Sequence, residues 1–190
     1  KNIFLRQSAG DTLILNRDNA ITASFAPEAK GQVKWFSRQT RVENGVYFED
    51  GVIWRRGEAL LRQEDILIPG LHNVENYMAA ILAVEGLVSD EDIRYVARHF
   101  GGVEHRIELV RVKDGVSYYN DSIASSPSRT IAGLRSFSKK VILIAGGYDK
   151  HIPYDVLGPE IAEHVKLLVC TGATGEKIAQ AAEKTGKAPE

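Results

Sequence analysis

The feature that most constrains the fold is a pair of short, wholly apolar segments in the second half of the chain, each closely followed by glycine. They are VILIA at Val141–Ala145 and LLVC at Leu167–Cys170. Both have the length of a strand and are bounded by turn residues, so both are predicted strands. Helix-compatible segments separate them, which predicts parallel strands covered by helices on both faces. The predicted fold class is therefore α/β, with a doubly wound, Rossmann-like second half.

The remainder of the second half fits this pattern. A hairpin is predicted from Ile107–Val112 and Val116–Asn120, with its turn at Asp114-Gly115. A helix is predicted to begin at Ser126-Pro127, with serine as N-cap and proline in the first turn. Further helices are predicted over roughly 154–165 and from about Gly175.

The first half predicts strands followed by two helices. The strands are expected at Asp11–Asn16, Gln32–Ser37, Gly45–Glu49 and Val52–Arg55. The apolar face of the first helix consists of Val74, Tyr77, Met78, Ile81 and Leu82. A capping box at Ser89 predicts the start of the second helix. Gly101-Gly102 ends that helix and marks the domain boundary, with domains at 1–102 and 103–190.

Composition excludes several classes of partner. The 24 Lys and Arg nearly balance the 25 Asp and Glu, and the net charge of -1 does not predict binding to nucleic acid or an anionic membrane. No apolar run approaches the roughly 20 residues of a membrane helix, and the first residues do not resemble a secretory signal. The single cysteine, Cys170, is typical of a reducing compartment. A cytoplasmic protein with no nucleic-acid or membrane partner is predicted.

Two polar segments follow predicted strands, where ligands bind in an open α/β sheet. In Asn120-Asp121-Ser122, Asp121 offers a carboxylate to ribose hydroxyls, although capping of a turn also accounts for the triplet. Gly146-Gly147 lets the backbone approach a ligand closely. Lys150 then offers a charge for a carboxylate or phosphate, and a solvated lysine beyond a glycine turn is the alternative.

Two further sets of residues lie at a helix start and at the domain boundary. His72, Asn73 and Asn76 begin a helix, where free N–H groups attract anions and side-chain amides can read a purine edge. Local capping is the alternative. His105 and Arg106 follow the diglycine, and Arg106 either binds a phosphate bidentately or pairs with a nearby glutamate.

Other kinds of chemistry are not supported. The segment Gly172–Lys177 lacks the spacing of a Walker phosphate loop, so it is interpreted as an ordinary strand–turn–helix junction. Five dispersed histidines and one cysteine provide no metal-binding spacing, and no nucleophile elbow occurs. The residues alone therefore predict a two-part α/β protein with a small-ligand site.

Four segments, taken in this order, resemble the Mur ligase family of ATP-dependent amide-bond ligases in bacterial cell-wall synthesis. The segments are GLHNVENYMAA, GGVEHRIELV, GVSYYNDSIASSPSRTIAGL and VILIAGGYDK. The likeness covers essentially the whole chain and follows the D-glutamate-adding member of the family. It implies that 1–102 is the C-terminal part of a central ATP-binding domain. It also implies that 103–190 is an acceptor domain for D-glutamate, incomplete at its end.

The resemblance implies a ligase that uses ATP and Mg²⁺. ATP phosphorylates the terminal carboxylate of UDP-N-acetylmuramoyl-L-alanine, and the amine of D-glutamate attacks the acyl phosphate. Such a reaction depends on positioning and charge neutralisation, without a protein nucleophile. The phosphate loop, the UDP-binding domain and most Mg²⁺ ligands are expected upstream of this segment, so the chain alone is expected to be inactive.

By matching positions, the resemblance implies roles for particular side chains. Contacts to ATP are expected from Asn73, Asn76, Arg106 and Asp121. The catalytic residue is expected to be His105, at a cleft between the domains. Binding of D-glutamate is expected from Lys150 and from Ser125, which replaces the family's usual threonine. Because the ATP contacts come from both sides of Gly102, domain closure is expected to assemble the site.

One position departs from the family pattern. Ile123 stands where the family commonly has a lysine that helps to bind the substrate's negative charges. Either another cation substitutes for it, or the acceptor binds differently. Two alternatives to the D-glutamate ligase stay open. One is another amino-acid ligase of the same fold, acting on a muramoyl peptide or on folate, and the other is a non-catalytic α/β binding module.

Overall fold

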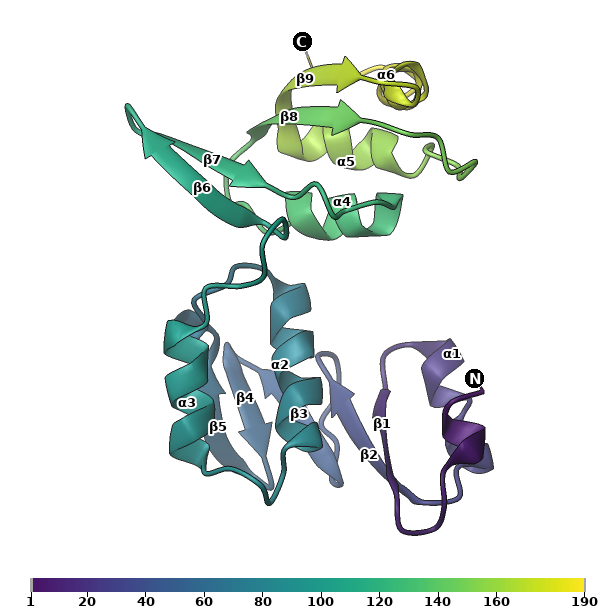
Figure 1. Cartoon of the computed structure of the whole chain (residues 1–190), viewed down its shortest axis with the longest axis vertical. Helices are drawn as coiled ribbons and strands as arrows, with labels where there is room; N and C mark the ends of the chain where they lie inside the picture. Colours follow the sequence, from purple (N-terminus) through teal and green to yellow (C-terminus); the bar gives the residue numbers. More distant parts are fainter. Residues whose placement is uncertain (1, 190) are drawn as a thin grey trace. The chain divides into compact units, whose positions relative to one another are not determined.

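The computed structural model describes residues 2–189. The chain divides into two compact units, unit 1 up to Phe100 and unit 2 from Gly101. The division falls immediately before the diglycine Gly101-Gly102. Each unit has a hydrophobic core of its own, and Figure 1 shows the helices and strands that form each unit. None of the helices in the described part of the chain has the length and hydrophobicity needed to cross a membrane.

Unit 1 contains a mixed sheet with the strand order β1-β2-β3-β4-β5. The strands are β1 (Thr12–Asn16), β2 (Gln32–Ser37), β3 (Gly45–Glu49), β4 (Val52–Arg55) and β5 (Glu58–Arg62). The pairs β1–β2 and β2–β3 are parallel, whereas β3–β4 and β4–β5 are antiparallel. The first four strands confirm the sequence prediction. The hairpin turn between β3 and β4 is also confirmed, because Asp50 and Gly51 both have positive φ.

Two helices, α2 and α3, lie over one face of this sheet (Figure 1). The helical segments of unit 1 are η1 (Phe4–Arg6), α1 (Ala20–Ala23), η2 (Ala26–Glu28), η3 (Gln63–Asp65), α2 (Leu71–Ala83) and α3 (Asp90–His99). The capping box predicted for α3 is confirmed. The hydroxyl of Ser89 accepts from the Asp92 N–H at 3.2 Å, and the Asp92 carboxylate accepts from the Ser89 N–H at 2.9 Å.

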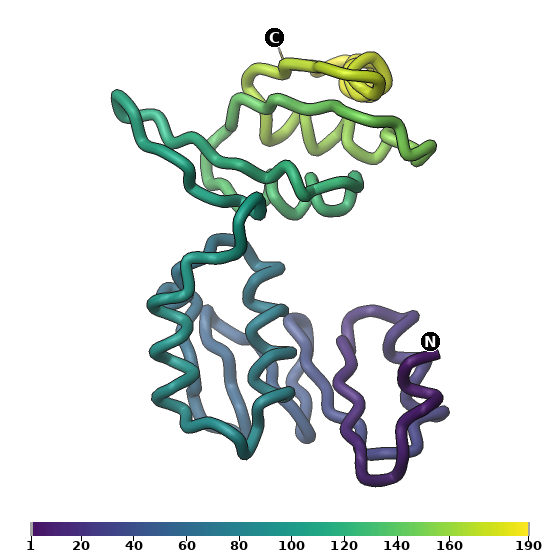
Figure 2. The backbone as a smooth tube through the Cα atoms, viewed as in Figure 1, coloured from purple at the N-terminus to yellow at the C-terminus, as the bar shows by residue number. Residues whose placement is uncertain are grey.

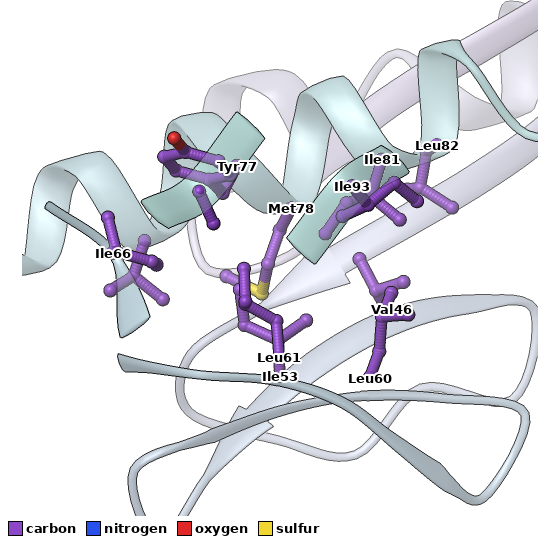
Figure 3. Packing of buried hydrophobic residues seen from close by; sticks show 12 residues of the cluster. Val46, Ile53, Leu60, Leu61, Ile66, Tyr77, Met78, Ile81, Leu82 and Ile93 are labelled. Carbon is purple, nitrogen blue, oxygen red and sulfur yellow. The ribbon is translucent and has the colours of Figure 1, made fainter. Parts of the chain in front are cut away.

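The core of unit 1 forms where α2 packs on the sheet. All five residues of the predicted apolar face of α2 are buried, which confirms that face. They are Val74, Tyr77, Met78, Ile81 and Leu82. Figure 3 shows Met78 directed toward Ile53 and Leu61 of the sheet. The packing of α2 fixes the start of that helix, which carries two of the candidate ATP contacts.

Unit 2 contains a hairpin and a separate pair of parallel strands, which can be followed along the tube in Figure 2. The hairpin consists of β6 (Glu108–Lys113) and β7 (Val116–Asn120). The parallel pair consists of β8 (Val141–Gly146) and β9 (Val165–Thr171). The helices are α4 (Pro127–Leu134), α5 (Leu157–His164) and α6 (Gly175–Glu183). The strand–helix alternation predicted for this half is therefore present.

The three helices of unit 2 share one core with the inward face of β8 and β9. Leu134, Ile161 and Ile178, one from each helix, are buried together against Leu143 and its neighbours. On the other face of β8, Ile142 and Ile144 are exposed in the described chain. The expected cover on both faces is therefore not observed here, because an apolar strand shows that a face is hydrophobic but not what covers it.

We expect Met78→Ala to destabilise unit 1 by about 2–5 kcal/mol, because the side chain has no solvent exposure and its removal leaves a cavity. Both tryptophans of the chain, Trp35 and Trp54, belong to unit 1, so their fluorescence during urea unfolding reports on this unit. The matched control is Leu87→Ala, at a side chain that is 80% exposed, with an expected change below about 0.5 kcal/mol. Equal effects of the two substitutions would contradict the assigned core.

Candidate functional site

The carboxyl end of β7 is joined by hydrogen bonds to the loop that precedes β6. The Ile123 N–H donates to the carbonyl oxygen of His105 at 3.3 Å, and the Asn120 amide lies 2.8 Å from His105 Nδ1. The Ile107 N–H donates to Asp121 Oδ1 at 3.1 Å. Residues at least 14 positions apart in the sequence are thereby brought into one cluster. This set of residues, called the β7 cluster below, contains His105, Arg106 and Asp121, three of the residues singled out in the sequence.

The hydrogen bonds of Asn120 favour one tautomer of His105. Asn120 Oδ1 accepts from the Ser122 N–H at 3.1 Å, so the amide nitrogen of Asn120 must be the atom that faces His105. That nitrogen can only donate, so Nδ1 of a neutral His105 accepts and its proton lies on Nε2. The backbone N–H of His105 is held by Glu108 Oε2 at 2.8 Å. The imidazole is thus oriented, with an N–H donor left on its exposed side chain.

The carboxylate of Asp121 is held in a restricted position. Besides its bond to the Ile107 N–H, it lies against Gly133 of α4, where an added Cβ would be 2.9 Å from Asp121 Oδ2. Ile107 and His105 both have positive φ, which is uncommon for residues with side chains and strained for a β-branched one. The local backbone therefore bends to bring the loop onto Asp121.

The other candidate residues near β7 are exposed. Arg106 lies between His105 and Ile107, with its N–H bonded to the Val103 carbonyl oxygen at 3.1 Å. Ser125 lies just before α4, and its N–H donates to the Ile123 carbonyl oxygen at 2.8 Å. The side chain of Ile123 is exposed, so a large apolar group faces solvent at this position.

Lys150 lies on a second loop, which follows β8. The loop begins at Gly146 and Gly147, both with positive φ, and the side chain of Lys150 is exposed. The preceding residue, Asp149, accepts from the His151 N–H at 2.8 Å and from Lys177 Nζ at 2.5 Å. Lys177 and the His151 N–H lower the pKa of Asp149 below its ordinary value. Lys177 belongs to the segment interpreted from sequence as an ordinary junction, and no sequence signal links it to a residue 28 positions away.

Asn73 and Asn76, at the start of α2 in unit 1, differ in their surroundings. Asn73 is buried, and its amide donates to the Pro69 carbonyl oxygen at 2.6 Å. Asn76 is exposed, and its amide donates to Asn73 Oδ1 at 3.2 Å. Asn73 therefore caps the preceding loop and orients Asn76, whose Oδ1 lies on the exposed side chain. Local capping is thus observed for Asn73, whereas the exposed side chain of Asn76 stays a candidate for ligand contact.

The described chain contains little else that could form a site. Within residues 2–189 no cluster of three or more His, Cys, Asp or Glu side chains is arranged to hold a metal ion. A shallow pocket on unit 1, lined by residues 38–41 and 47–50, includes none of the candidate residues. The candidate residues thus lie in three separate places, which are the β7 cluster and the β8 loop in unit 2 and the start of α2 in unit 1.

Comparison with known proteins identifies the family of the chain. Residues 105–190, which carry both the β7 cluster and the β8 loop, match the family model of the Mur ligase, glutamate ligase domain. A UDP-N-acetylmuramoylalanine–D-glutamate ligase of Acetivibrio thermocellus is 58% identical over 98% of this chain. The chain belongs to the Mur ligase family. A ligase with the same name from Clostridium botulinum is 53% identical over 94% of the chain.

The chain spans about two fifths of the length of these relatives, 42% of the first and 39% of the second. Solved Mur ligase structures share its fold at low sequence identity. MurF from Acinetobacter baumannii matches 98% of this chain and 43% of its own, with a TM-score of 0.72 and 18% identity. MurC from Thermotoga maritima matches 94% of this chain and 42% of its own, with a TM-score of 0.68 and 15% identity.

We expect Asn73→Ala to lower the stability of unit 1 by about 1–3 kcal/mol, because it leaves the Pro69 carbonyl oxygen without its donor. Asn76→Ala is the comparison variant and should cost less, because its side chain is exposed and its removal affects only the bond to Asn73 Oδ1. Urea unfolding followed by tryptophan fluorescence separates the two. A larger loss for Asn76→Ala would contradict the division of roles.

Proposed function

We propose that this chain forms part of an ATP-dependent ligase that joins D-glutamate to UDP-N-acetylmuramoyl-L-alanine in peptidoglycan precursor synthesis. The observation that carries the proposal is the high identity, along nearly the whole chain, with relatives named as D-glutamate ligases. The β7 cluster and the β8 loop support it, since each offers charged groups suited to one of the substrates.

The proposed reaction has two steps. A carboxylate oxygen of UDP-N-acetylmuramoyl-L-alanine attacks the γ-phosphorus of ATP, the bond from that phosphorus to the bridging oxygen breaks, and ADP leaves. The free amine of D-glutamate then attacks the carbonyl carbon of the acyl phosphate. The nitrogen loses a proton, the carbon–oxygen bond to phosphate breaks, and phosphate leaves with the electron pair. Binding, orientation and charge stabilisation are the tasks left to the protein.

In unit 2, Asp121 accepts hydrogen bonds from the ribose hydroxyls of ATP, and Arg106 binds a phosphate of the nucleotide. His105 is the proposed catalytic residue. With Asn120 fixing its tautomer, its Nε2–H donates to an oxygen that gains negative charge during the reaction. Lys150 binds a carboxylate of D-glutamate, and Ser125 donates or accepts a hydrogen bond in the same pocket. Ile123 has no charge, so Arg106 and Lys150 are the cations that neutralise the negative charge of the substrates.

In unit 1, Asn76 reads the edge of the adenine with its exposed amide. Asn73 supports the adenine contact by holding Asn76, as its burial and its two hydrogen bonds indicate. Mg²⁺ bound to ATP would neutralise phosphate charge. The described residues contain no metal-binding cluster. The binding and catalytic roles proposed here are those of this chain's own side chains. We propose a cytoplasmic location, in keeping with a single free cysteine.

The function is tested by phosphate release from the full-length protein with Mg-ATP and UDP-N-acetylmuramoyl-L-alanine. The acceptors offered are D-glutamate, L-glutamate, L-lysine or none, and release should require D-glutamate. Lys150→Ala should raise the KM for D-glutamate about 10- to 100-fold, because a charged hydrogen bond is worth about 1.5–3 kcal/mol. The matched control is Lys139→Ala, an exposed lysine just before the opposite end of β8, with no expected change.

Each other outcome of this assay has a distinct meaning. Release with a different acceptor would assign the protein to another ligase of this fold. Absence of release from a folded, full-length protein would contradict the ligase itself. A change in the KM for ATP, but not for D-glutamate, in Lys150→Ala would move that residue to the nucleotide site.

Gly133→Ala should raise the KM for ATP about two- to tenfold in the same protein. The added methyl group displaces the Asp121 carboxylate, at the cost of roughly one hydrogen bond to ribose. Alanine itself favours a helix over glycine by about 1 kcal/mol, so general weakening of α4 would not explain the loss. Gly10→Ala, where an added Cβ meets only a serine oxygen at 4.0 Å, is the control. An unchanged KM in Gly133→Ala would contradict the role of Asp121.

A further inference from the structure

The β8 loop, which carries Lys150, is held by hydrogen bonds to the loop that follows β9. In the parallel register, Gly146 lies opposite Thr171. The Gly147 N–H donates to the Thr171 carbonyl oxygen at 3.2 Å, and the Gly147 carbonyl oxygen accepts from the Thr174 N–H at 3.2 Å. The Thr174 hydroxyl donates to the same carbonyl oxygen at 3.4 Å. Thr174 is only 2% exposed, so a buried polar side chain secures the beginning of the Lys150 loop.

Asp149, which precedes Lys150, makes two further hydrogen bonds that hold the same loop. One carboxylate oxygen accepts from the His151 N–H at 2.8 Å, which closes a turn around Lys150. The other oxygen accepts from Lys177 Nζ at 2.5 Å, which ties this turn to α6. The Asp149 side chain is 19% exposed, whereas Lys177 is 51% exposed. His151 has a φ of 56°, a left-handed conformation that the turn must hold in place.

The two lysines of this region differ in what they contact. Lys177 is paired with Asp149, and the pair raises the pKa of Lys177 and lowers that of Asp149, so both are charged near neutral pH. Lys150 is exposed and has no ion pair within the described chain. The charge of Lys177 is therefore used inside the protein, and that of Lys150 is available to an anionic ligand.

We propose that Lys177 and Thr174 are positioning residues, which hold loop 146–151 in the conformation where Lys150 binds the carboxylate of the amino-acid acceptor. This inference rests on the proposed function. A loop fixed before the ligand arrives loses less conformational freedom on binding, so its fastening contributes to affinity. An exposed ion pair contributes little to overall stability, so its loss should affect the acceptor more than the fold.

The test compares Lys177→Ala with Lys184→Ala in the full-length enzyme. Lys184 also belongs to the α6 region and also pairs with an aspartate, Asp155 at 2.8 Å, but that pair does not involve the Lys150 loop. Lys177→Ala should raise the KM for D-glutamate roughly threefold to fivefold, with the KM for ATP and the melting temperature unchanged. Lys184→Ala should leave the KM for D-glutamate unchanged. Lys177→Arg, which keeps the charge, should restore most of the affinity.

Two further measurements make the result specific to the loop. Amide hydrogen exchange, followed by mass spectrometry, should become faster at residues 147–151 in Lys177→Ala and stay unchanged in Lys184→Ala. Thr174→Val should also speed exchange there, and Thr174→Ser, which retains the hydroxyl, should not. The double variant Asp149→Ala with Lys177→Ala should have the same KM for D-glutamate as Asp149→Ala alone, because both changes remove one contact.

The outcomes separate this inference from the proposed function. If wild-type enzyme requires D-glutamate but Lys177→Ala and Lys184→Ala behave alike, the positioning role is overturned and the function stands. Equal increases in the KM for ATP and for D-glutamate would also overturn it, since they indicate a general structural effect. If wild-type enzyme does not use D-glutamate, the proposed function fails first, whatever the exchange data show.

Discussion

The parallel ladder between β8 and β9 determines where the loops that follow these two strands lie. Its register brings the two carboxyl ends level, with Gly146 beside Thr171. The backbones come so close that a Cβ on Gly146 would overlap the Thr171 carbonyl oxygen, so glycine is required there. Gly172, with a φ of 67°, turns the second loop back, and an added Cβ would lie 2.9 Å from the Gly147 nitrogen. The hydrogen bonds between the loops follow from this close approach, as does the placement of Lys150.

Much of this fold could be predicted, because periodicity and turn chemistry are local signals. The pattern of α2 and the capping box at Ser89 each depend on neighbours within a few turns, and both appear in the structure. Strand β5 is not predicted from the sequence, because Glu58–Arg62 has the sequence EALLR, in which most residues favour a helix. This segment is a strand because it pairs with β4. Ser126 begins α4 as predicted, yet its hydroxyl contacts Ser128 Oγ at 3.2 Å and caps no helix N–H. The serine therefore marks the start without the expected bond.

The candidate site was less predictable, because its residues act through contacts between distant segments. The order of motifs indicated Asp121 and Lys150, but not that Asp121 lies against Gly133 or that Asp149, next to Lys150, pairs with Lys177. Nor could the sequence separate Asn73 from Asn76, since burial distinguishes them and both carry the same amide. A pattern of residue types lists the groups available for chemistry. Which group touches a ligand, and which holds another in place, is decided by packing.

One local device recurs where strands give way to loops. A short polar side chain accepts from the N–H two residues later, forming an Asx turn around the residue between them. Three examples are Asn16 with Asp18 at 2.9 Å, Asn120 with Ser122 at 3.1 Å, and Asp149 with His151 at 2.8 Å. The enclosed residue is charged each time: Arg17, which lies over the ring of Trp35, then Asp121 and Lys150. The side chain of the first residue makes the turn, and the turn fixes the backbone of the enclosed residue. The charged group of the enclosed residue takes no part in the turn and can make another contact. In Arg17 that contact is an aromatic ring of the same unit, in Asp121 it is the Ile107 N–H, and the side chain of Lys150 is exposed.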